Sequence, residues 1–456
     1  MKFFGRDEEI EALRREVRIS ETHSRLVDIT GRRGVGKTTL SLKVAFESAR
    51  PMLYFLCRRG YAQEALAGVW MDDVRETFGL ADDAGPRRLT LANVIKFVMS
   101  LSREKPCVMI LDECQELDDV APAFWADLQG VWDVGKDTSR LLLMMIGVVA
   151  PAMRHIFDDA GEPLFGRQDM SLRLRPFSPL LLRELFLACN PKGRPDDLLT
   201  LYAVTGGVAS HVNFLAESAP LTREDMVNLI FSEKGDGFRA EGERILADTL
   251  PPESDAYERI LRALAGDSAK GGDIVEQLQG QAMAGAMDRL ESHYGMVRKM
   301  APMFSDSPRG IRYAISDPYF RFWFRFIEPA QYQSQAARGN WAALRSVCFN
   351  ALEQYTGRTL EDWYHDLIGS SPNWTRIGRW WDRKGLNEID LIALNELSHH
   401  ITIYEIKRNP KKVDLAVMAV KAKAFREASQ KELKKYPEPR LLGLSLEMLL
   451  DDPAGL

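Results

Sequence analysis

Short apolar runs alternate with helical patterns over the first 180 residues of the chain. Four runs have the length and the aliphatic, β-branched character of buried strands: RLVDIT (25–30), PMLYFLC (51–57), CVMILDE (107–113) and LLLMMIG (141–147). A glycine-rich loop follows the first run and leads into SLKVAFESA (41–49), whose apolar residues have helical spacing. Alternating strands and helices are typical of a parallel sheet wrapped by helices, so we expect an α/β domain over residues 1–180.

The pattern of the middle of the chain is mainly helical. Helical spacing with short loops predicts a helical lid over residues 181–252. AYERILRALA, GGDIVEQLQ and AMAGAMDRLESHYGMV then predict three short amphipathic helices, and a hairpin-like stretch lies around SPRGIRYAIS. This order predicts a winged helix over residues 253–335. Its third helix, Gly280 to Arg289, carries only one basic residue, which favours a structural or regulatory module over a helix that binds the DNA major groove.

Residues 336–456 predict a second α/β domain. FNALEQYTGRTLEDWYHDLI (349–368) is a long amphipathic helix, and it is followed by two strand-like runs, EIDLIAL (388–394) and TIYEIKR (402–408), and by the basic helix AVMAVKAKAFREA (416–428). Upstream, the aromatic stretch DPYFRFWFRFIEP (317–329) has helical spacing, which favours core or interdomain packing over base stacking.

Composition narrows the class of protein without identifying it. The chain has 456 residues, 45% hydrophobic and 27% charged, with a formal net charge of -5, which excludes disordered and fibrous classes and allows two to four domains. Residues 6–18 are densely charged, and no apolar run reaches the roughly 18 residues of a membrane span, so we expect a cytoplasmic protein without a membrane partner. The five cysteines are scattered and predict reduced thiols rather than a zinc site.

GRRGVGKTTL (31–40) has the P-loop pattern GxxxxGK[ST] between a strand and a helix. Its glycines let backbone N–H groups turn inward around phosphates, Lys37 can reach the β- and γ-phosphate oxygens, and the Thr38 hydroxyl suits Mg²⁺. A glycine-rich turn without function rarely combines this spacing with both flanking elements. We therefore expect ATP and Mg²⁺ to be bound by Gly31, Gly34, Val35, Gly36, Lys37, Thr38 and Thr39.

The third apolar run ends in two adjacent acids, as a Walker B strand does. Asp112 can hold the hydration shell of Mg²⁺, and Glu113 can orient and deprotonate the attacking water. The alternative is a strand that merely ends in a polar turn. After the fourth run the residues are Val148 and Val149, at a place where related ATPases often carry a polar γ-phosphate sensor, so the sequence offers no such sensor there.

Three further segments point to a known group. FFGRDEEI (3–10), PFSPLLLREL (176–185) and TGGVASHVNFL (205–215), together with the P-loop and the acidic pair, resemble the AAA+-related STAND ATPases, particularly the archaeal-type ATPase family. The resemblance implies an AAA+-like ATPase with a helical lid. The third segment is similar to the family's GGxP segment, but Ala209 stands where proline is usual.

The same resemblance implies roles for two arginines. Arg6, in the GRxxE box, would lie near the base or the phosphates of the nucleotide, although Arg6 and Glu9 could simply cap a first helix. Arg167 would sense the γ-phosphate, either in its own subunit or across a subunit interface. A surface or salt-bridged arginine is the alternative for Arg167.

The C-terminal domain offers a second chemistry. Asp390 and the Glu405-x-Lys407 pair stand on two apolar strands, so two carboxylates and an ammonium can converge, as in PD-(D/E)XK nucleases. Asp390 and Glu405 would bind Mg²⁺, Lys407 would stabilise the nucleophile or the phosphate, and Glu361 matches the acidic helix residue that many such nucleases add. A bare [DE]xK triplet is common, so the strands around it carry the argument.

Two observations add to this interpretation. From Ser371 to Arg440 the chain has 15 Lys and Arg against 9 Asp and Glu, so a nucleic-acid contact is expected there. The segment also resembles the endonuclease-like domain of unknown function that follows archaeal ATPases, and DPYFRFWFRF is similar to the segment that joins the two in that family. The alternative is a degenerate domain in which Asp390 and Lys407 form a buried ion pair.

These features lead to one hypothesis and two alternatives. We expect an ATP-binding and ATP-hydrolysing switch coupled to a Mg²⁺-dependent C-terminal nuclease that acts on nucleic acid. One alternative is an ATP-gated DNA-binding or scaffolding protein with an inactive nuclease-like domain. The other is a homo-oligomeric STAND signalling protein whose C-terminal domain binds a partner protein.

Overall fold

The computed structural model describes residues 3–58, 60–148, 151–251, 255–265, 281–305 and 310–452. The predicted helix GGDIVEQLQ (271–279) lies outside these ranges. The chain divides into two compact units, here called the N-terminal unit (Phe3–Arg175) and the C-terminal unit (Pro176–Leu456). Each is described by itself.

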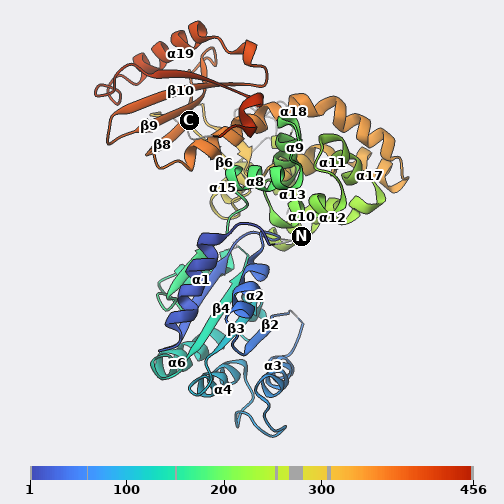
Figure 1. Ribbon diagram of the computed structural model, residues 1–456, viewed down its shortest axis with the longest axis vertical. Helices are drawn as coiled ribbons and strands as arrows, with labels where there is room; N and C mark the ends of the chain where they lie inside the picture. Colours follow the sequence, from blue (N-terminus) through green and yellow to red (C-terminus); the bar gives the residue numbers. More distant parts are fainter. Residues whose placement is uncertain are drawn as a thin grey trace. The chain divides into compact units, whose positions relative to one another are not determined.

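The N-terminal unit is built on one parallel sheet of five strands in the order β2-β3-β4-β1-β5 (Figure 1). The strands are β1 (Arg25–Thr30), β2 (Met52–Leu56), β3 (Cys107–Asp112), β4 (Leu141–Gly147) and β5 (Met170–Arg173). The predicted α/β class with a parallel sheet is confirmed. The pattern did not reveal β5, because it has only four residues and none of them is buried.

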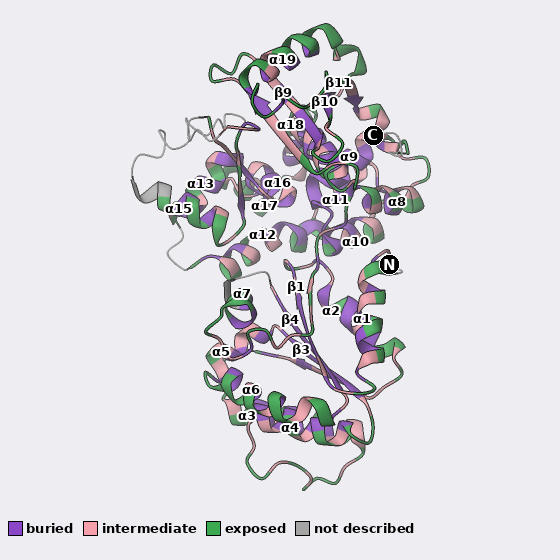
Figure 2. Cartoon of the chain, turned by 90° about the vertical axis from the view of Figure 1, so that its left-hand side faces the viewer, coloured by how far each residue is buried: buried purple, intermediate pink, exposed green. Residues whose placement is uncertain are grey.

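Two groups of helices cover the two faces of this sheet. One face packs on α1 (Asp7–Ile19) and α2 (Lys37–Glu47) through Leu13, Leu40 and Val44. The other is covered by α3 (Gln63–Phe78), α4 (Leu91–Ser102), α6 (Phe124–Gly135) and α7 (Pro151–Asp158), with the short α5 (Leu117–Val120) nearby. Figure 2 shows that β1, β3 and β4 are almost wholly buried between these layers. Strands buried on both faces explain why their sequences are continuous apolar runs rather than alternating ones.

The first part of the C-terminal unit is helical. It contains α8 (Pro179–Cys189), α9 (Pro195–Thr205), α10 (Ala209–Ser218), α11 (Arg223–Ile230), α12 (Asp236–Thr249), α13 (Asp255–Ala265) and α15 (Gln281–Ser292). The antiparallel pair β6 (Val297–Met300) and β7 (Arg312–Ile315) follows, as the hairpin-like sequence predicted. The helix expected to continue to Val297 ends earlier, because Gly295 adopts a left-handed φ of 63° and Val297 begins β6.

The aromatic segment forms α16 (Pro318–Phe326), and its side chains are buried, in line with the predicted packing role. The Trp323 indole N–H donates to the Arg239 carbonyl at 2.7 Å, and a Cβ on Gly242 would meet the Trp323 ring at 2.3 Å. Glycine at position 242 is therefore required for α12 and α16 to approach each other. Two helices come next, α17 (Ala330–Ala337) and the 29-residue α18 (Trp341–Gly369).

A second sheet completes the C-terminal unit. Its strands are β8 (Arg376–Trp381), β9 (Glu388–Asn395), β10 (His400–Lys407) and β11 (Arg440–Ser445), in the order β11-β10-β9-β8. The strand β9 pairs antiparallel with both β8 and β10, and β11 runs parallel to β10. The helix α19 (Leu415–Ala428) packs on the sheet through Met418, Ala422 and Phe425, and α18 contacts β8, β9 and β10.

None of the described helices combines the length and the apolar character that a bilayer crossing requires. Four of the five cysteines are buried, and all five are free thiols.

The buried Asp28 on β1 generates a prediction about stability and pH. One of its carboxylate oxygens accepts a hydrogen bond from the Ser171 hydroxyl at 2.8 Å, the other has no hydrogen-bond partner among the described residues, and burial raises the pKa of Asp28 to about 6. A folded-state pKa above the unfolded value means that the contribution of Asp28 to stability is complete below pH 4 and is lost as the pH rises through about 6. Asn resembles the protonated carboxyl in shape, so Asp28→Asn should stabilise the protein at pH 8 by up to about 3 kcal/mol and change little at pH 4.

Thermal unfolding of the wild type and Asp28→Asn between pH 4 and pH 8 tests this. The exposed Asp83→Asn is the matched control and should give no pH-dependent difference. A gap between wild type and Asp28→Asn that stays constant with pH would contradict the assignment of a buried, protonated Asp28.

Candidate functional site

The P-loop joins the carboxyl end of β1 to the first turn of α2. Gly34 and Gly36 have left-handed φ values of 76° and 102°, which other residues rarely adopt, and Gly36 precedes the first residue of α2, Lys37. A Cβ on Gly31 would lie 2.5 Å from the Leu174 carbonyl oxygen, so a side chain is excluded there. The backbone N–H groups at the start of α2, with its dipole, form a site for anions.

Lys37 is 6% exposed and its ammonium lies inside this loop. It donates to the carbonyl oxygens of Gly31 at 2.8 Å and Arg32 at 3.2 Å. Burial lowers the pKa of Lys37, while the nearby Glu113 and Asp112 act in the opposite direction. The ammonium is held where a phosphate at the mouth of the loop can replace the two carbonyl oxygens.

Asp112, at the end of β3, joins the P-loop to the neighbouring strand. One of its oxygens accepts from the Thr38 hydroxyl at 2.6 Å and from the Tyr54 hydroxyl at 2.9 Å, and the other accepts from the Glu113 backbone N–H at 3.0 Å. The structure thus brings together the predicted Thr38 and Asp112. Tyr54 was not predicted, because its contact depends on β2 lying next to β3 in the sheet, which the chain order alone does not give.

Glu113 follows with a left-handed φ of 53°, and its carboxylate accepts from the Gln115 amide at 2.7 Å. The strained backbone turns the side chain away from the direction that β3 would give it. The sequence did not predict the role of Gln115 either. A contact between residues two positions apart, at a 3₁₀ turn (Cys114–Glu116), leaves no periodic pattern in the sequence.

The donor set at the P-loop fits Mg²⁺. The Thr38 hydroxyl and the Asp112 carboxylate are hard oxygen ligands on adjacent elements, and Mg²⁺ in such sites keeps several waters and takes only one or two protein ligands. The described residues contain no group of three or more His, Cys, Asp or Glu able to hold a metal ion.

The other residues that the sequence predicts to bind nucleotide lie at separate places in the N-terminal unit. Arg6 is buried, forms an ion pair with Glu9 at 3.0 Å, and donates to the backbone carbonyls of Val35 at 3.4 Å and Arg175 at 2.6 Å. Burial lowers the pKa of Arg6. Arg6 thereby ties the P-loop to the segment after β5, with its guanidinium on the backbone of the loop. Within the loop Val35 is buried, whereas Thr39 is exposed on α2.

Arg167 is not at the P-loop contacts described above. Its guanidinium forms a bidentate ion pair with Asp133 of α6: Nε lies 3.0 Å from one carboxylate oxygen and Nη2 lies 3.0 Å from the other. This hydrogen bond is the main cause that raises the pKa of Arg167 and lowers that of Asp133. The geometry corresponds to the salt-bridged alternative, and a role at a subunit interface stays a prediction.

A second group of predicted residues converges in the C-terminal sheet. Asp390 lies on β9, and Glu405 and Lys407 lie on the neighbouring β10. The Lys407 ammonium is 3.0 Å from an oxygen of Asp390 and 3.0 Å from an oxygen of Glu405. The Ile406 backbone N–H donates to Asp390 at 2.8 Å. Two carboxylates from neighbouring strands thus share the Lys407 ammonium.

Glu361, on α18, lies beside this group. Its carboxylate pairs with Arg379 of β8 at 3.1 Å, yet burial raises the pKa of Glu361 to about 7, and Asp390 adds to the rise. Glu361 is therefore close enough to Asp390 for their charges to interact, and its role as the acidic helix residue stays a prediction. Its pairing with Arg379 was not predicted.

The next residue, Asp362, is the centre of a buried ion cluster. Arg298 of β6 lies 2.5 Å from it, Arg379 of β8 lies 2.9 Å and Arg321 of α16 lies 3.5 Å from it. Burial alone would raise the pKa of Asp362, but the arginines outweigh burial and hold it well below its usual range. One carboxylate thus links the hairpin, the aromatic helix, α18 and the C-terminal sheet.

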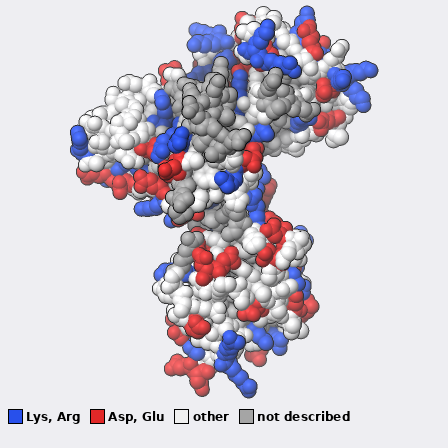
Figure 3. Space-filling view, turned by 180° about the vertical axis from the view of Figure 1, so that it is seen from behind, with Lys and Arg blue, Asp and Glu red and all other residues white. Residues whose placement is uncertain are grey.

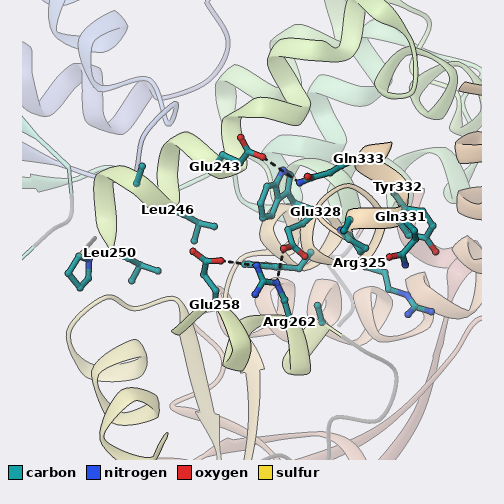
Figure 4. Close-up of a pocket in the computed structure, with 17 residues that line it drawn as sticks. Glu243, Leu246, Leu250, Glu258, Arg262, Arg325, Glu328, Gln331, Tyr332 and Gln333 are labelled. Atoms are coloured by element: carbon teal, nitrogen blue, oxygen red, sulfur yellow. Dashed lines mark hydrogen bonds and ion pairs between the residues drawn. The ribbon is translucent and has the colours of Figure 1, made fainter. Parts of the chain in front are cut away.

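A cavity of about 840 Å³ lies elsewhere in the C-terminal unit (Figure 4). In Figure 4, Arg262 points into it from α13 and pairs with Glu258 at 2.8 Å and Glu328 at 2.7 Å. None of the predicted site residues lines this cavity, so it belongs to neither of the two sites.

The parallel sheet and the glycine loop of the N-terminal unit have the arrangement of a P-loop domain. In agreement, residues 2–131 match the family model described as AAA ATPase domain, which covers the P-loop, Asp112 and Glu113. Residues 323–418 match a second model, described as archaea bacterial proteins of unknown function, which runs from α16 into α19.

Similar proteins cover most of the chain at low identity. The uncharacterized protein MJECL04 of Methanocaldococcus jannaschii is 24% identical over 422 residues, which is 89% of this chain and 87% of that protein. Among solved structures, the Walker-type ATPase PABY2304 of Pyrococcus abyssi covers 71% of this chain and 96% of its own at 20% identity, with a TM-score of 0.49. The STAND protein PH0952 of Pyrococcus horikoshii has 14% identity and a TM-score of 0.34, over 81% of this chain and 48% of its own. None of these likenesses assigns a function.

The Asp362 cluster predicts a large loss of stability when its acid is removed. Asp362→Asn leaves Arg298, Arg321 and Arg379 without their shared carboxylate, and breaking a buried ion network in this way costs about 3–5 kcal/mol. Chemical denaturation should show this loss, while Glu353→Gln, exposed on the same helix, should be neutral. An unchanged midpoint for Asp362→Asn would mean that the arginines find other partners.

Proposed function

We propose that this protein binds ATP with Mg²⁺ at the P-loop and hydrolyses it, and that the bound nucleotide acts as a switch. The observation that carries the proposal is the hydrogen bond from Thr38 to Asp112, which sets the two expected metal ligands next to the buried Lys37. A chain that used the P-loop only as a structural turn would have no reason to bury an ammonium and a carboxylate together at a helix N-terminus.

Each residue has a distinct part in the reaction. The loop N–H groups and Lys37 would hold the β- and γ-phosphates, and Thr38 and Asp112 would hold Mg²⁺, which would neutralise charge on the transferred phosphoryl group. Glu113 accepts the proton of the attacking water, and Gln115 fixes the direction of its carboxylate. Arg6 positions the P-loop through the Val35 carbonyl, and Arg167 acts on nucleotide only if it leaves Asp133.

The chain is further proposed to consist of four parts: the ATPase domain (1–180), a helical lid (181–252), a winged helix (253–335) and a nuclease-like domain (336–456). The helices α8 to α12 and the β6–β7 pair are consistent with this order.

Substitutions at the P-loop test the ATPase proposal. Lys37→Ala removes the phosphate-binding cation and should abolish ATP binding, measured with a fluorescent ATP analogue. Glu113→Gln keeps the shape of the side chain but cannot accept a proton, so it should bind ATP normally and hydrolyse it about 10²–10⁴-fold more slowly. Glu104→Gln, exposed in the same unit, is the control. Full hydrolysis by Glu113→Gln would exclude Glu113 as the base.

A second function is proposed for the C-terminal sheet: Mg²⁺-dependent cleavage of nucleic acid. The observation in its favour is that Lys407 lies between two carboxylates from neighbouring strands, with Glu361 beside Asp390. Asp390 and Glu405 would hold Mg²⁺, which supplies an activated water and charge neutralisation. Lys407 would then be free to contact the phosphate, and Glu361, with its raised pKa, could give or take a proton near pH 7.

The surface around this sheet supports a nucleic-acid partner. Figure 3 shows Lys and Arg side chains, with Asp and Glu among them, on the surface of the part that carries the C-terminal sheet. Exposed cations there include Lys384, Lys411, Lys412, Lys431, Lys434 and Lys435. Cations spread in this way attract phosphates without reading the sequence of bases.

Cleavage of single- and double-stranded DNA and RNA with Mg²⁺ or Mn²⁺ tests the second function. Wild type should cleave at least one substrate, and Asp390→Ala should lose cleavage by at least about 10²-fold while it retains binding, because only the metal ligand is removed. Glu427→Ala, exposed on α19, is the control. Lys37→Ala, assayed with and without ATP, shows whether the nucleotide gates cleavage. Absence of cleavage in the wild type would favour an ATP-gated binding protein with an inactive C-terminal domain.

A further inference from the structure

Two lysines from different elements bind the same carboxylate in the C-terminal sheet. The Lys421 ammonium, from α19, lies 3.0 Å from each of the two oxygens of Glu405, and Lys407 lies 3.0 Å from one of them. The Glu405 side chain is 8% exposed and that of Lys421 is 18% exposed, so water screens their attraction poorly. Both oxygens of Glu405 are therefore already occupied by cations.

This arrangement opposes the binding of a divalent metal ion. Asp390 and Glu405 bring two negative charges, which Lys407 and Lys421 balance with two positive ones. A metal ion on Glu405 would meet the Lys421 ammonium at the same oxygens, and like charges at such a distance repel strongly in a partly buried place. Metal and Lys421 thus compete for Glu405.

The two lysines differ in what their removal would do. Lys407 stands on β10, bridges Asp390 and Glu405, and has a part of its own in the proposed reaction. Lys421 touches Glu405 alone among the described acids and comes from a separate helix. Its four-carbon stem is flexible and its ammonium is a point charge, so it can turn to another anion without a change of backbone.

We propose that Lys421 keeps divalent metal off Glu405 until the phosphate backbone of a nucleic acid draws its ammonium away. The site then binds its metal more tightly when substrate is present. This inference rests on the second function proposed above, and it assigns that function a regulation by its own substrate.

The surroundings of Lys421 identify the anion as a phosphate backbone. Lys411 and Lys412, just before α19, and Lys423, on α19 itself, are exposed and form no ion pair with a described residue. A row of free cations beside Lys421 attracts a polyanion more than a single small anion, because each neutralised phosphate releases a counterion. A bound backbone would place phosphates within reach of the Lys421 side chain.

Binding of Mn²⁺, followed by electron paramagnetic resonance, tests the competition without any need for cleavage. The full-length chain is used without nucleotide, and the part of the Mn²⁺ signal that Asp390→Ala removes is assigned to the C-terminal site. Lys421→Met should bind Mn²⁺ there at least about tenfold more tightly than wild type, because one competing charge is gone. Lys421→Arg keeps the charge and should resemble wild type, and so should the matched control Lys423→Met.

Addition of a single- or double-stranded 20-nucleotide DNA tests the role of the phosphate backbone. In the wild type the DNA should tighten Mn²⁺ binding at the same site by about tenfold, and in Lys421→Met it should add almost nothing, because the competing lysine is already absent. Inorganic phosphate at equal phosphate concentration should have little effect if a continuous backbone is needed.

The outcomes separate this inference from the function on which it rests. Equal Mn²⁺ affinity in wild type and Lys421→Met would show that Lys421 does not compete with the metal ion, although the site still binds it. Tightening by DNA that persists in Lys421→Met would overturn the part played by Lys421. Absence of Mn²⁺ from the C-terminal site in every variant, with or without DNA, would overturn both the inference and the proposed metal site.

Discussion

Both sites depend on one physical constraint: a carboxylate that leaves water must find donors that satisfy its charge. Asp112 finds hydroxyls from Thr38 and Tyr54 and a backbone N–H, all neutral. Glu405 finds two ammoniums, and Asp362 finds three guanidiniums. The kind of donor decides how each acid can be used. Neutral donors leave the negative charge of Asp112 unbalanced, whereas the two lysines balance that of Glu405.

The ion pairs of Asp362 are connected to those of Glu361 beside the C-terminal site. Glu361 and Asp362 are adjacent on α18, and Arg379 pairs with both. Arg298 and Arg321 reach the same carboxylate from the hairpin and from the aromatic helix. A displacement of either element would therefore disturb the ion pairs of Glu361, whose carboxylate interacts with Asp390. The helices and the sheet of the C-terminal unit are linked through charge as well as through apolar packing.

How far the sequence predicts each feature depends on how local that feature is. Four of the five strands of the parallel sheet match the apolar runs: β1 and β4 coincide with them, and β2 and β3 differ from them by one residue at one or both ends, because strands buried on both faces are mostly apolar. The strand β5, with four half-exposed residues, leaves no such signature. Tyr54, Gln115 and Lys421 were missed for a related reason: each contacts a site residue across a turn or between elements, and nothing in the local pattern of the chain records that proximity.

The sequence by itself determined the phosphate loop, the acidic strand end and the alternation of elements, because these depend on backbone freedom, burial and spacing within a few residues. It also placed Asp390, Glu405 and Lys407 on neighbouring strands. Only the tertiary structure decided which donors each carboxylate received. Arg167 pairs with Asp133, Arg379 with both Glu361 and Asp362, and Lys421 with Glu405, because charged side chains choose among the partners that folding brings within reach. Residues tens or hundreds of positions apart are brought together by packing alone.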